Sequence, residues 1–111
     1  MLTFKFNKDN TACVVTDCDQ NVTGTVTIPD TYSGKDVVGI GKDAFNGCKN
    51  MTDVIIPDSI KKIGNRAFSF CTGLTNIVIP DSVKTAGEGI FISCTSLKSV
   101  VLSYGISAER I

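Results

Sequence analysis

Cysteine is the residue type here with the widest chemical range, because a thiol can act as a nucleophile, bind a metal or form a disulfide. The chain has 5 cysteines, and Cys48, Cys71 and Cys94 follow one another at a constant interval of 23 residues. If each interval adds one layer to a stack of parallel strands, neighbouring cysteines lie about 4.8 Å apart with parallel side chains, and a disulfide between them would need distorted geometry. We therefore predict reduced, buried thiols at a repeated structural position.

The other two cysteines, Cys13 and Cys18, form a single C-x4-C pair. Structural zinc sites use four ligands, usually from two close pairs, and this pair has no partner pair. We therefore expect no metal site. Cys18 is expected to be the cysteine that reaches solvent, and the adjacent Asp17 and Asp19 should raise its pKa and make it a poor nucleophile.

Groups suited to general acid–base catalysis are scarce, since the chain has no histidine. Asp58 and Asp81 each stand in a Pro-Asp-Ser sequence, where aspartate typically bonds to the backbone of its own turn. Residues 87–89 (Gly-Glu-Gly) lack the third glycine and the lysine of a phosphate-binding loop. We expect no catalytic residue and no cofactor. An enzyme would need a convergent polar cluster, for which Asp53 and Asn76 are the residues to test.

Charge and length limit the partners of the chain. Its 111 residues include 11 basic and 11 acidic side chains, so no overall field attracts nucleic acid or an anionic membrane. No stretch of 18 apolar residues and no basic, apolar leader is present, so we expect neither membrane insertion nor a signal peptide in this chain. A cytoplasmic location and the prior removal of a leader both stay open.

Internal repetition is the strongest organising signal. Residues 40–62 and 63–85 align without a gap, and residues 86–108 form a third copy with the same apolar columns. Residues 22–39 match part of the repeat and form a degenerate first copy. We predict a single domain over residues 1–111, in which residues 1–21 form an N-terminal cap.

Each copy predicts one turn of a solenoid, here called a rung. The spacing Leu74-x-x-Ile77-x-Ile79 ends in the two-residue period of a half-buried strand, which Pro80 then stops. A large ring recurs in the copies at Phe45, Phe68 and Phe91. Stacking aligns these rings in one buried column, because a rung cannot bury its apolar side alone. The predicted fold is a β-rich solenoid with parallel strands on one face and short strands or 3-10 turns on the other.

The N-terminal segment predicts a β-hairpin. Residues 2–6 and 12–15 are apolar segments separated by the turn-forming sequence Asn-Lys-Asp-Asn at residues 7–10. Terminal rungs need a cap, and this hairpin should supply it. An insertion of five residues at 31–35, which includes Tyr32, should bulge from the first rung.

The motif I-G-x-x-A-F-x-x-C-x-x-L-x-x-I-x-I-P, which starts at Ile63 and recurs every 23 residues, resembles the BspA-type leucine-rich repeat family. The resemblance covers residue 22 to about residue 108, with departures at Ala86 and Ser103. It implies a leucine-rich-repeat solenoid from a cell-surface or secreted protein, usually a longer one, that adheres to host or neighbouring-cell proteins. It implies no cofactor.

The two-residue period leaves alternate strand side chains outside, where stacking gathers them in two columns. The first column is Thr27, Ile55, Val78 and Val101, and the second is Thr25, Asp53, Asn76 and Ser99. An exposed apolar stripe beside a polar one is typical of a contact surface, although β-branched residues also favour strands without any role in binding. We predict that this face binds a protein or glycan, with the Tyr32 insertion as the alternative site.

The last rung is expected to be open on one side, since the sequence ends where a further copy would begin. The side chains concerned are Phe91, Leu97, Val100, Leu102 and Ile106. Such an end is usually covered by more repeats, a partner or a second copy. We expect a homo-oligomer through this rung, unless Glu109 and Arg110 fold over it. An assembly unit of a larger surface protein is therefore the alternative function.

Overall fold

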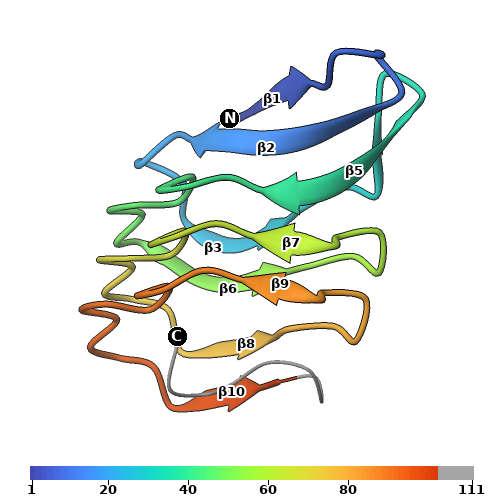
Figure 1. The fold of residues 1–111 in the computed structure, drawn as a ribbon. Helices are drawn as coiled ribbons and strands as arrows, with labels where there is room; N and C mark the ends of the chain where they lie inside the picture. The colour runs from blue at the N-terminus through green and yellow to red at the C-terminus, as the bar shows by residue number, and fades with distance from the viewer. Residues whose placement is uncertain (103–111) are drawn as a thin grey trace.

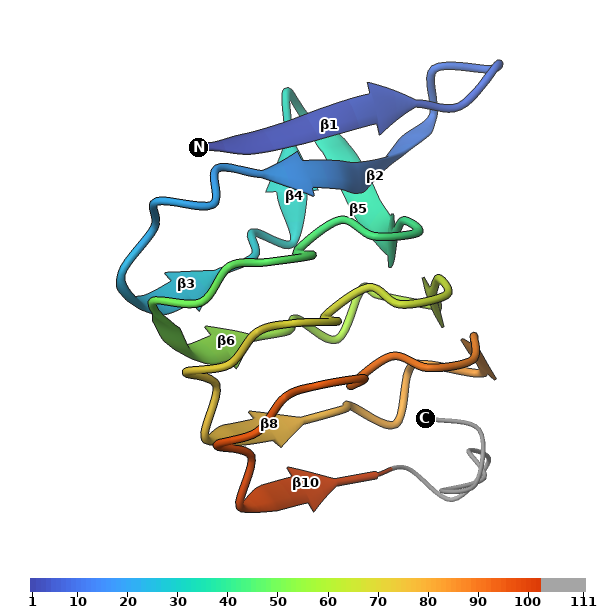
Figure 2. The ribbon, with the colours of Figure 1, turned by 90° about the vertical axis from the view of Figure 1, so that its left-hand side faces the viewer.

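The computed structural model describes residues 1–102 and shows a β-solenoid whose chain winds between two sheets (Figure 1). Sheet B contains four parallel strands in the order β10-β8-β6-β3. Sheet A has the order β1-β2-β5-β7-β9, and β4 pairs with β5. Figure 2 shows the rungs stacked below the N-terminal hairpin. The predicted solenoid, with parallel strands on one face and shorter strands on the other, is confirmed.

The strands of sheet B each contain the residue that starts the predicted two-residue period. They are β3 (Gly24–Thr27), β6 (Met51–Ile55), β8 (Asn76–Val78) and β10 (Ser99–Val101). Val54 pairs with Ile77, and Ile77 pairs with Val100, so the pairing follows the 23-residue repeat. Val26 pairs with Val54 across a longer interval, because the insertion lies between them.

Sheet A continues the same rungs on the opposite face. Its parallel strands are β2 (Ala12–Cys18), β5 (Lys35–Ile40), β7 (Lys62–Ile63) and β9 (Thr85–Ala86). Ile40 pairs with Ile63, and Ile63 pairs with Ala86. The strands β7 and β9 have only two residues each, because the turns at residues 57–60 and 80–83 end just before them.

The N-terminal hairpin forms as predicted and closes the first end of sheet A. The strand β1 (Leu2–Phe6) runs antiparallel to β2, which in turn pairs in parallel with β5. Phe4 and Phe6 are half-buried and pack against the core. The hairpin thus adds one strand, β1, to sheet A, and the apolar side of that strand packs against the core.

The insertion is a second, smaller hairpin. The strand β4 (Thr31–Tyr32) folds back onto Lys35 and Asp36 through Ser33 and Gly34, which both have positive φ angles (53° and 77°). The Tyr32 ring stacks on Phe4 with the centroids 4.0 Å apart. The insertion is therefore fixed to the cap.

The phenylalanine column forms the centre of the core. Phe45 and Phe68 are fully buried, with ring centroids 5.0 Å apart. Phe91 stacks on Phe68 at 5.9 Å but is only half-buried. The prediction of a buried column is confirmed for the first two rings and wrong for Phe91, which lies in the last described rung and packs against a neighbouring ring on one side.

The repeated cysteines form a second column, with Cys48 and Cys71 buried and Cys94 half-buried. The Cys71 thiol donates a hydrogen bond to the carbonyl oxygen of Phe45 at 3.1 Å, and the Cys94 thiol donates to that of Phe68 at 3.0 Å. The repeat uses cysteine here because a thiol is small and apolar yet can donate a hydrogen bond to the preceding rung.

The prediction for Cys18 was wrong, because this residue is buried, with 3% of its surface exposed. The strand β2 continues to Cys18, beyond the predicted end at Val15, and turns the side chain into the core. Burial is the main cause that raises the pKa of Cys18, and the neighbouring aspartates add a smaller effect.

Candidate functional site

The outer surface of sheet B carries both predicted columns. Strand pairing places the polar column side by side in the order Thr25, Asp53, Asn76 and Ser99. In the apolar column Ile55, Val78 and Val101 are 54%, 58% and 52% exposed. Thr27 pairs with Ile55 and completes this column. Because the intervening Val54 and Ile77 are buried, the alternation between core and surface is complete along these strands.

The two columns line an open groove of about 500 Å³. Its walls contain Thr25, Asp53 and Asn76 from the polar column, with Ile55 and Val78 from the apolar column. A second hollow of about 500 Å³ begins at Val78 and continues beyond the ends of the strands. Six of the eight predicted contact residues therefore line these two hollows, which meet at Val78, whereas Thr27 and Ser99 line neither.

Hydrogen bonds along the strands order the polar side of this groove. Thr52 Oγ1 donates to Asp53 Oδ2 at 3.0 Å, and Asn76 Nδ2 donates to Thr75 Oγ1 at 3.1 Å. Thr75 Oγ1 donates in turn to the Thr52 carbonyl at 3.2 Å, which joins two rungs. Among residues 1–102, aspartates line the two hollows and neither lysine nor arginine does, so this part of the surface is acidic.

Asp58 and Asp81 extend the acidic surface past the strand ends. The backbone closes the first of these turns, since the Ile60 N–H donates to the Pro57 carbonyl at 3.2 Å, and an equivalent bond closes the second. Neither aspartate forms a side-chain hydrogen bond within residues 1–102, so the prediction that they bond to their own turns was wrong. Sequence reasoning left them out of the face because they follow the alternating segment. Their recurrence after each proline was the available signal.

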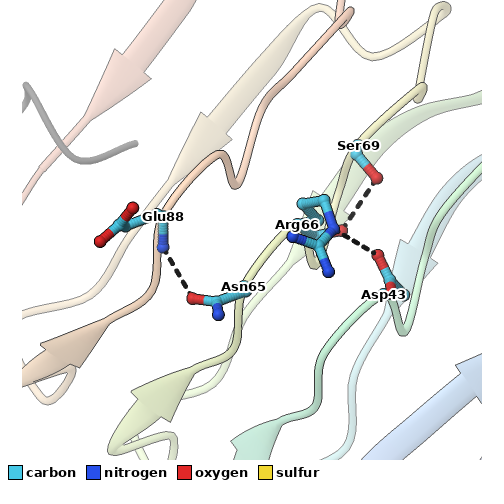
Figure 3. Close-up of polar contacts among 5 residues, drawn as sticks. All are labelled: Asp43, Asn65, Arg66, Ser69 and Glu88. Atoms are coloured by element: carbon cyan, nitrogen blue, oxygen red, sulfur yellow. Dashed lines mark hydrogen bonds and ion pairs between the residues drawn. The ribbon is translucent and has the colours of Figure 1, made fainter.

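A second group of polar contacts joins the loops that follow β5 and β7 to the next rung (Figure 3). Arg66 Nε lies 3.4 Å from Asp43 Oδ1, and the Glu88 N–H donates to Asn65 Oδ1 at 2.9 Å. Ser69 Oγ donates to the Arg66 carbonyl at 3.0 Å. Each of the first two contacts connects consecutive rungs, so this group supports the stack. The partly exposed ion pair contributes little to stability.

Sequence reasoning missed two exposed apolar side chains on the loops, Phe70 and Ile92. Phe70 has a positive φ of 58° and occupies the repeat position held by Gly47 and Ser93 in the neighbouring rungs. An aromatic residue at a position otherwise held by glycine or serine was the available signal.

The predicted interface residues of the C-terminal rung lie together. Phe91, Leu97, Val100 and Leu102 are half-buried and pack against the core from one side. Within residues 1–102, β10 pairs only with β8 and forms one edge of sheet B. Ile106 lies outside the described residues.

Most thiols are held in their protonated form. Burial raises the pKa of Cys48 to about 12 and also raises that of Cys13. Contact between Cys71 and Cys94 raises the pKa of Cys71 and lowers that of Cys94. No group of three or more metal-ligating side chains occurs within residues 1–102. The exposed groove of sheet B is therefore the best candidate site, and its side chains offer shape, apolar contact and hydrogen bonds.

The repeated strand, the phenylalanine column and the exposed sheet define a leucine-rich-repeat solenoid. The family model for the BspA type leucine rich repeat region (6 copies) matches residues 20–109, so the chain belongs to this family. The family is commonly surface-associated, and leucine-rich-repeat proteins are generally non-enzymatic. The described part of the chain, residues 1–102, contains no helix long and apolar enough to cross a membrane.

Solved structures of leucine-rich-repeat proteins share the fold. The T. pallidum Leucine Rich Repeat protein is 28% identical with a TM-score of 0.85, and the match covers 92% of this chain and 47% of that protein. A protein from Bacteroides ovatus is 36% identical (TM-score 0.80; 96% and 29% covered), and one from Bacteroides capillosus is 25% identical (TM-score 0.65; 91% and 93% covered). The chain thus spans less than half the length of the first two. No curated protein matches the chain.

Proposed function

We propose that this chain is a recognition module that binds a protein partner through the exposed face of sheet B, and that it acts in adhesion at the cell surface or outside the cell. The observation that carries the proposal is the apolar column Ile55, Val78 and Val101. These side chains are exposed beside a polar column, and they line the two open hollows of this face. Monomeric proteins seldom leave contiguous apolar surface in water without a contact to make.

The surface has the composition of a protein interface. Apolar side chains can supply the desolvated centre, and Asp53 and Asn76 can supply hydrogen bonds at its rim. The apolar column favours a protein over a glycan for this face. Because β6 and β8 are each held on both sides by neighbouring strands, binding at the centre of this face orders little additional chain. Family membership supports a repeat module for protein interaction, and no catalytic role is proposed.

Val78→Lys should weaken partner binding at least tenfold, because it places a charged, flexible side chain in the middle of the apolar column. The melting temperature should change little, since the Val78 side chain points to solvent. The immobilised chain would first be presented with bacterial surface proteins and with extracellular-matrix proteins. Each retained protein would then be purified, and its Kd measured against the original chain and the variant.

Thr72→Lys is the matched control, because Thr72 is an exposed loop residue of the same repeat copy and lies away from the strand face. It should leave the Kd unchanged. Equal binding by the Val78 variant, or no specific retention in either protein set, would contradict the proposed face.

Self-association through the C-terminal rung is a second candidate function. It is favoured by the half-buried side chains Phe91, Leu97, Val100 and Leu102, whose counterparts one rung earlier are all buried. The edge strand β10 also offers backbone groups to a further strand. An isologous contact between two copies would cover both features at once.

Light scattering tests this second candidate directly. We expect the mean mass to rise from monomer toward dimer over the micromolar concentration range, and Val100→Lys to keep the chain monomeric. A strict monomer at all concentrations would eliminate self-association as a function of this chain.

A further inference from the structure

The outer surface of sheet A carries a row of residues that crosses all five strands of its main path. Consecutive strand pairings place the row in the order Lys5, Val14, Gly39, Lys62 and Thr85. Lys5 and Lys62 are three strand spacings apart, or about 14 Å. The sequence separates these lysines widely, and the hairpin brings them onto one line parallel to the solenoid axis.

Four residues of this row, Lys5, Val14, Lys62 and Thr85, line two adjoining hollows. One, of about 350 Å³, lies between Lys5 and Lys62, and the other, of about 340 Å³, continues from Lys62 to Lys42. Gly39 leaves room for Val14 and Lys62, since a Cβ there would lie 3.0 Å from Val14 Cγ1 and 3.1 Å from Lys62 Cγ. The Lys62 stem therefore lies across the glycine.

The charged side chains that line the two hollows are all lysines. Among residues 1–102, no aspartate or glutamate lines either hollow. Within residues 1–102, Lys5, Lys42 and Lys62 form no ion pair with a carboxylate. Three acidic residues lie near the hollows without lining them: Asp36, which pairs with Ala12, Asp43, which follows Lys42, and Glu88, whose N–H donates to Asn65 Oδ1. The chain has no net charge, yet this surface is basic while the groove of sheet B is acidic.

We propose that the outer surface of sheet A is a second binding site, distinct from the protein-binding face of sheet B, and that it takes a linear anionic polysaccharide along the solenoid axis. The open groove accepts an extended polymer, and the lysines stand along its length. Lysine attracts sulfate or carboxylate groups as a point charge and does not require a fixed geometry.

Other polyanions fit this surface less well. Single-stranded nucleic acid uses stacked aromatic residues, and within the described part of the chain Phe6 is the only aromatic residue that lines the two hollows. A membrane surface calls for exposed apolar side chains beside the lysines, and none of the large exposed apolar residues within residues 1–102 lines these hollows. Protein interfaces are depleted in lysine at their centre. The basic row therefore favours a polysaccharide.

Binding of the full chain to heparin and to hyaluronate, measured by titration calorimetry at low and at physiological salt, tests the proposal. We expect binding of at least one of these polymers that weakens with salt, and no binding of neutral dextran. The double substitution Lys5→Gln and Lys62→Gln should weaken binding about tenfold, because two adjacent charges are removed from the groove. The substitution Val78→Lys in sheet B should not weaken it.

The matched control is Lys49→Gln with Lys98→Gln, which removes two exposed lysines that precede strands of sheet B. It should leave the affinity within about twofold of the original chain. Equal losses in the two double variants would overturn the site. Absence of salt-sensitive binding would overturn it as well, as would tighter binding of a polythymidylate oligonucleotide or of phosphatidylserine vesicles than of either polysaccharide.

Discussion

Phe68→Ala should lower the free energy of unfolding by about 3–5 kcal/mol, the loss typical of a large aromatic side chain removed from a packed core. Phe68 is fully buried, and its ring stacks between Phe45 and Phe91. Truncation would leave a cavity in the centre of the column, and neighbouring rungs cannot close it without breaking their own hydrogen bonds. Urea unfolding followed by circular dichroism measures the effect.

Phe70→Ala is the matched control for this substitution. It removes a ring of the same size from the same loop, but Phe70 is half-exposed. Its backbone is left-handed (φ 58°), and an alanine at this position would adopt the same conformation. We expect a change within about 1 kcal/mol. A loss below about 1 kcal/mol for Phe68→Ala itself would show that the phenylalanine column does not hold the rungs together.

Gly64→Ala should cost about 1–3 kcal/mol, as overpacking usually does. A Cβ at Gly64 would lie 2.6 Å from the backbone nitrogen of Lys42 and 2.9 Å from the carbonyl carbon of Gly41. Both are backbone atoms of the preceding rung, so the rungs would have to move apart. The Gly64 N–H also donates to the Ile40 carbonyl at 2.7 Å, and this bond would lengthen. Thermal unfolding of the variant beside the original chain measures the loss.

Gly41→Ala is the control that separates the cost of pushing two rungs apart from the general loss of stability when glycine is replaced. Gly41 is the equivalent residue one rung earlier, and a Cβ there would lie 3.2 Å from the Val15 carbonyl oxygen. A small shift can relieve that contact, so we expect a smaller loss than at Gly64. Equal losses at both positions would contradict an effect of close approach between rungs.

The repeat could be predicted because two periods coincide in it. The two-residue period determines which side chains of Asn76, Ile77 and Val78 face the core, and the 23-residue period determines their neighbours. Together the two periods predict the order of both columns on sheet B. Binding by these columns stays a prediction, because strand formation alone also selects β-branched residues.

Features that depend on single, unrepeated contacts could not be predicted. Cys18 is buried because β2 continues further than its apolar residues indicate, and nothing in the repeat constrains that length. Tyr32 packs on Phe4 because a turn of positive φ folds the insertion back. The basic row of sheet A requires Lys5 and Lys62 to meet through β2 and β5, which pair with a register shift next to Val14. Periodicity encodes none of these pairings.

The hydrogen bonds between rungs have a consequence for how such a chain folds and lengthens. Lys84 donates to Lys61, and Phe68 donates to Ile90, so each bond spans about one repeat in sequence. The loop that must close to add a rung therefore has the same length wherever the rung lies in the stack. The mean sequence separation of contacts does not grow as rungs are added, and the entropy cost of each closure stays constant. Duplication of a 23-residue segment can thus extend the array without making its topology more difficult to fold.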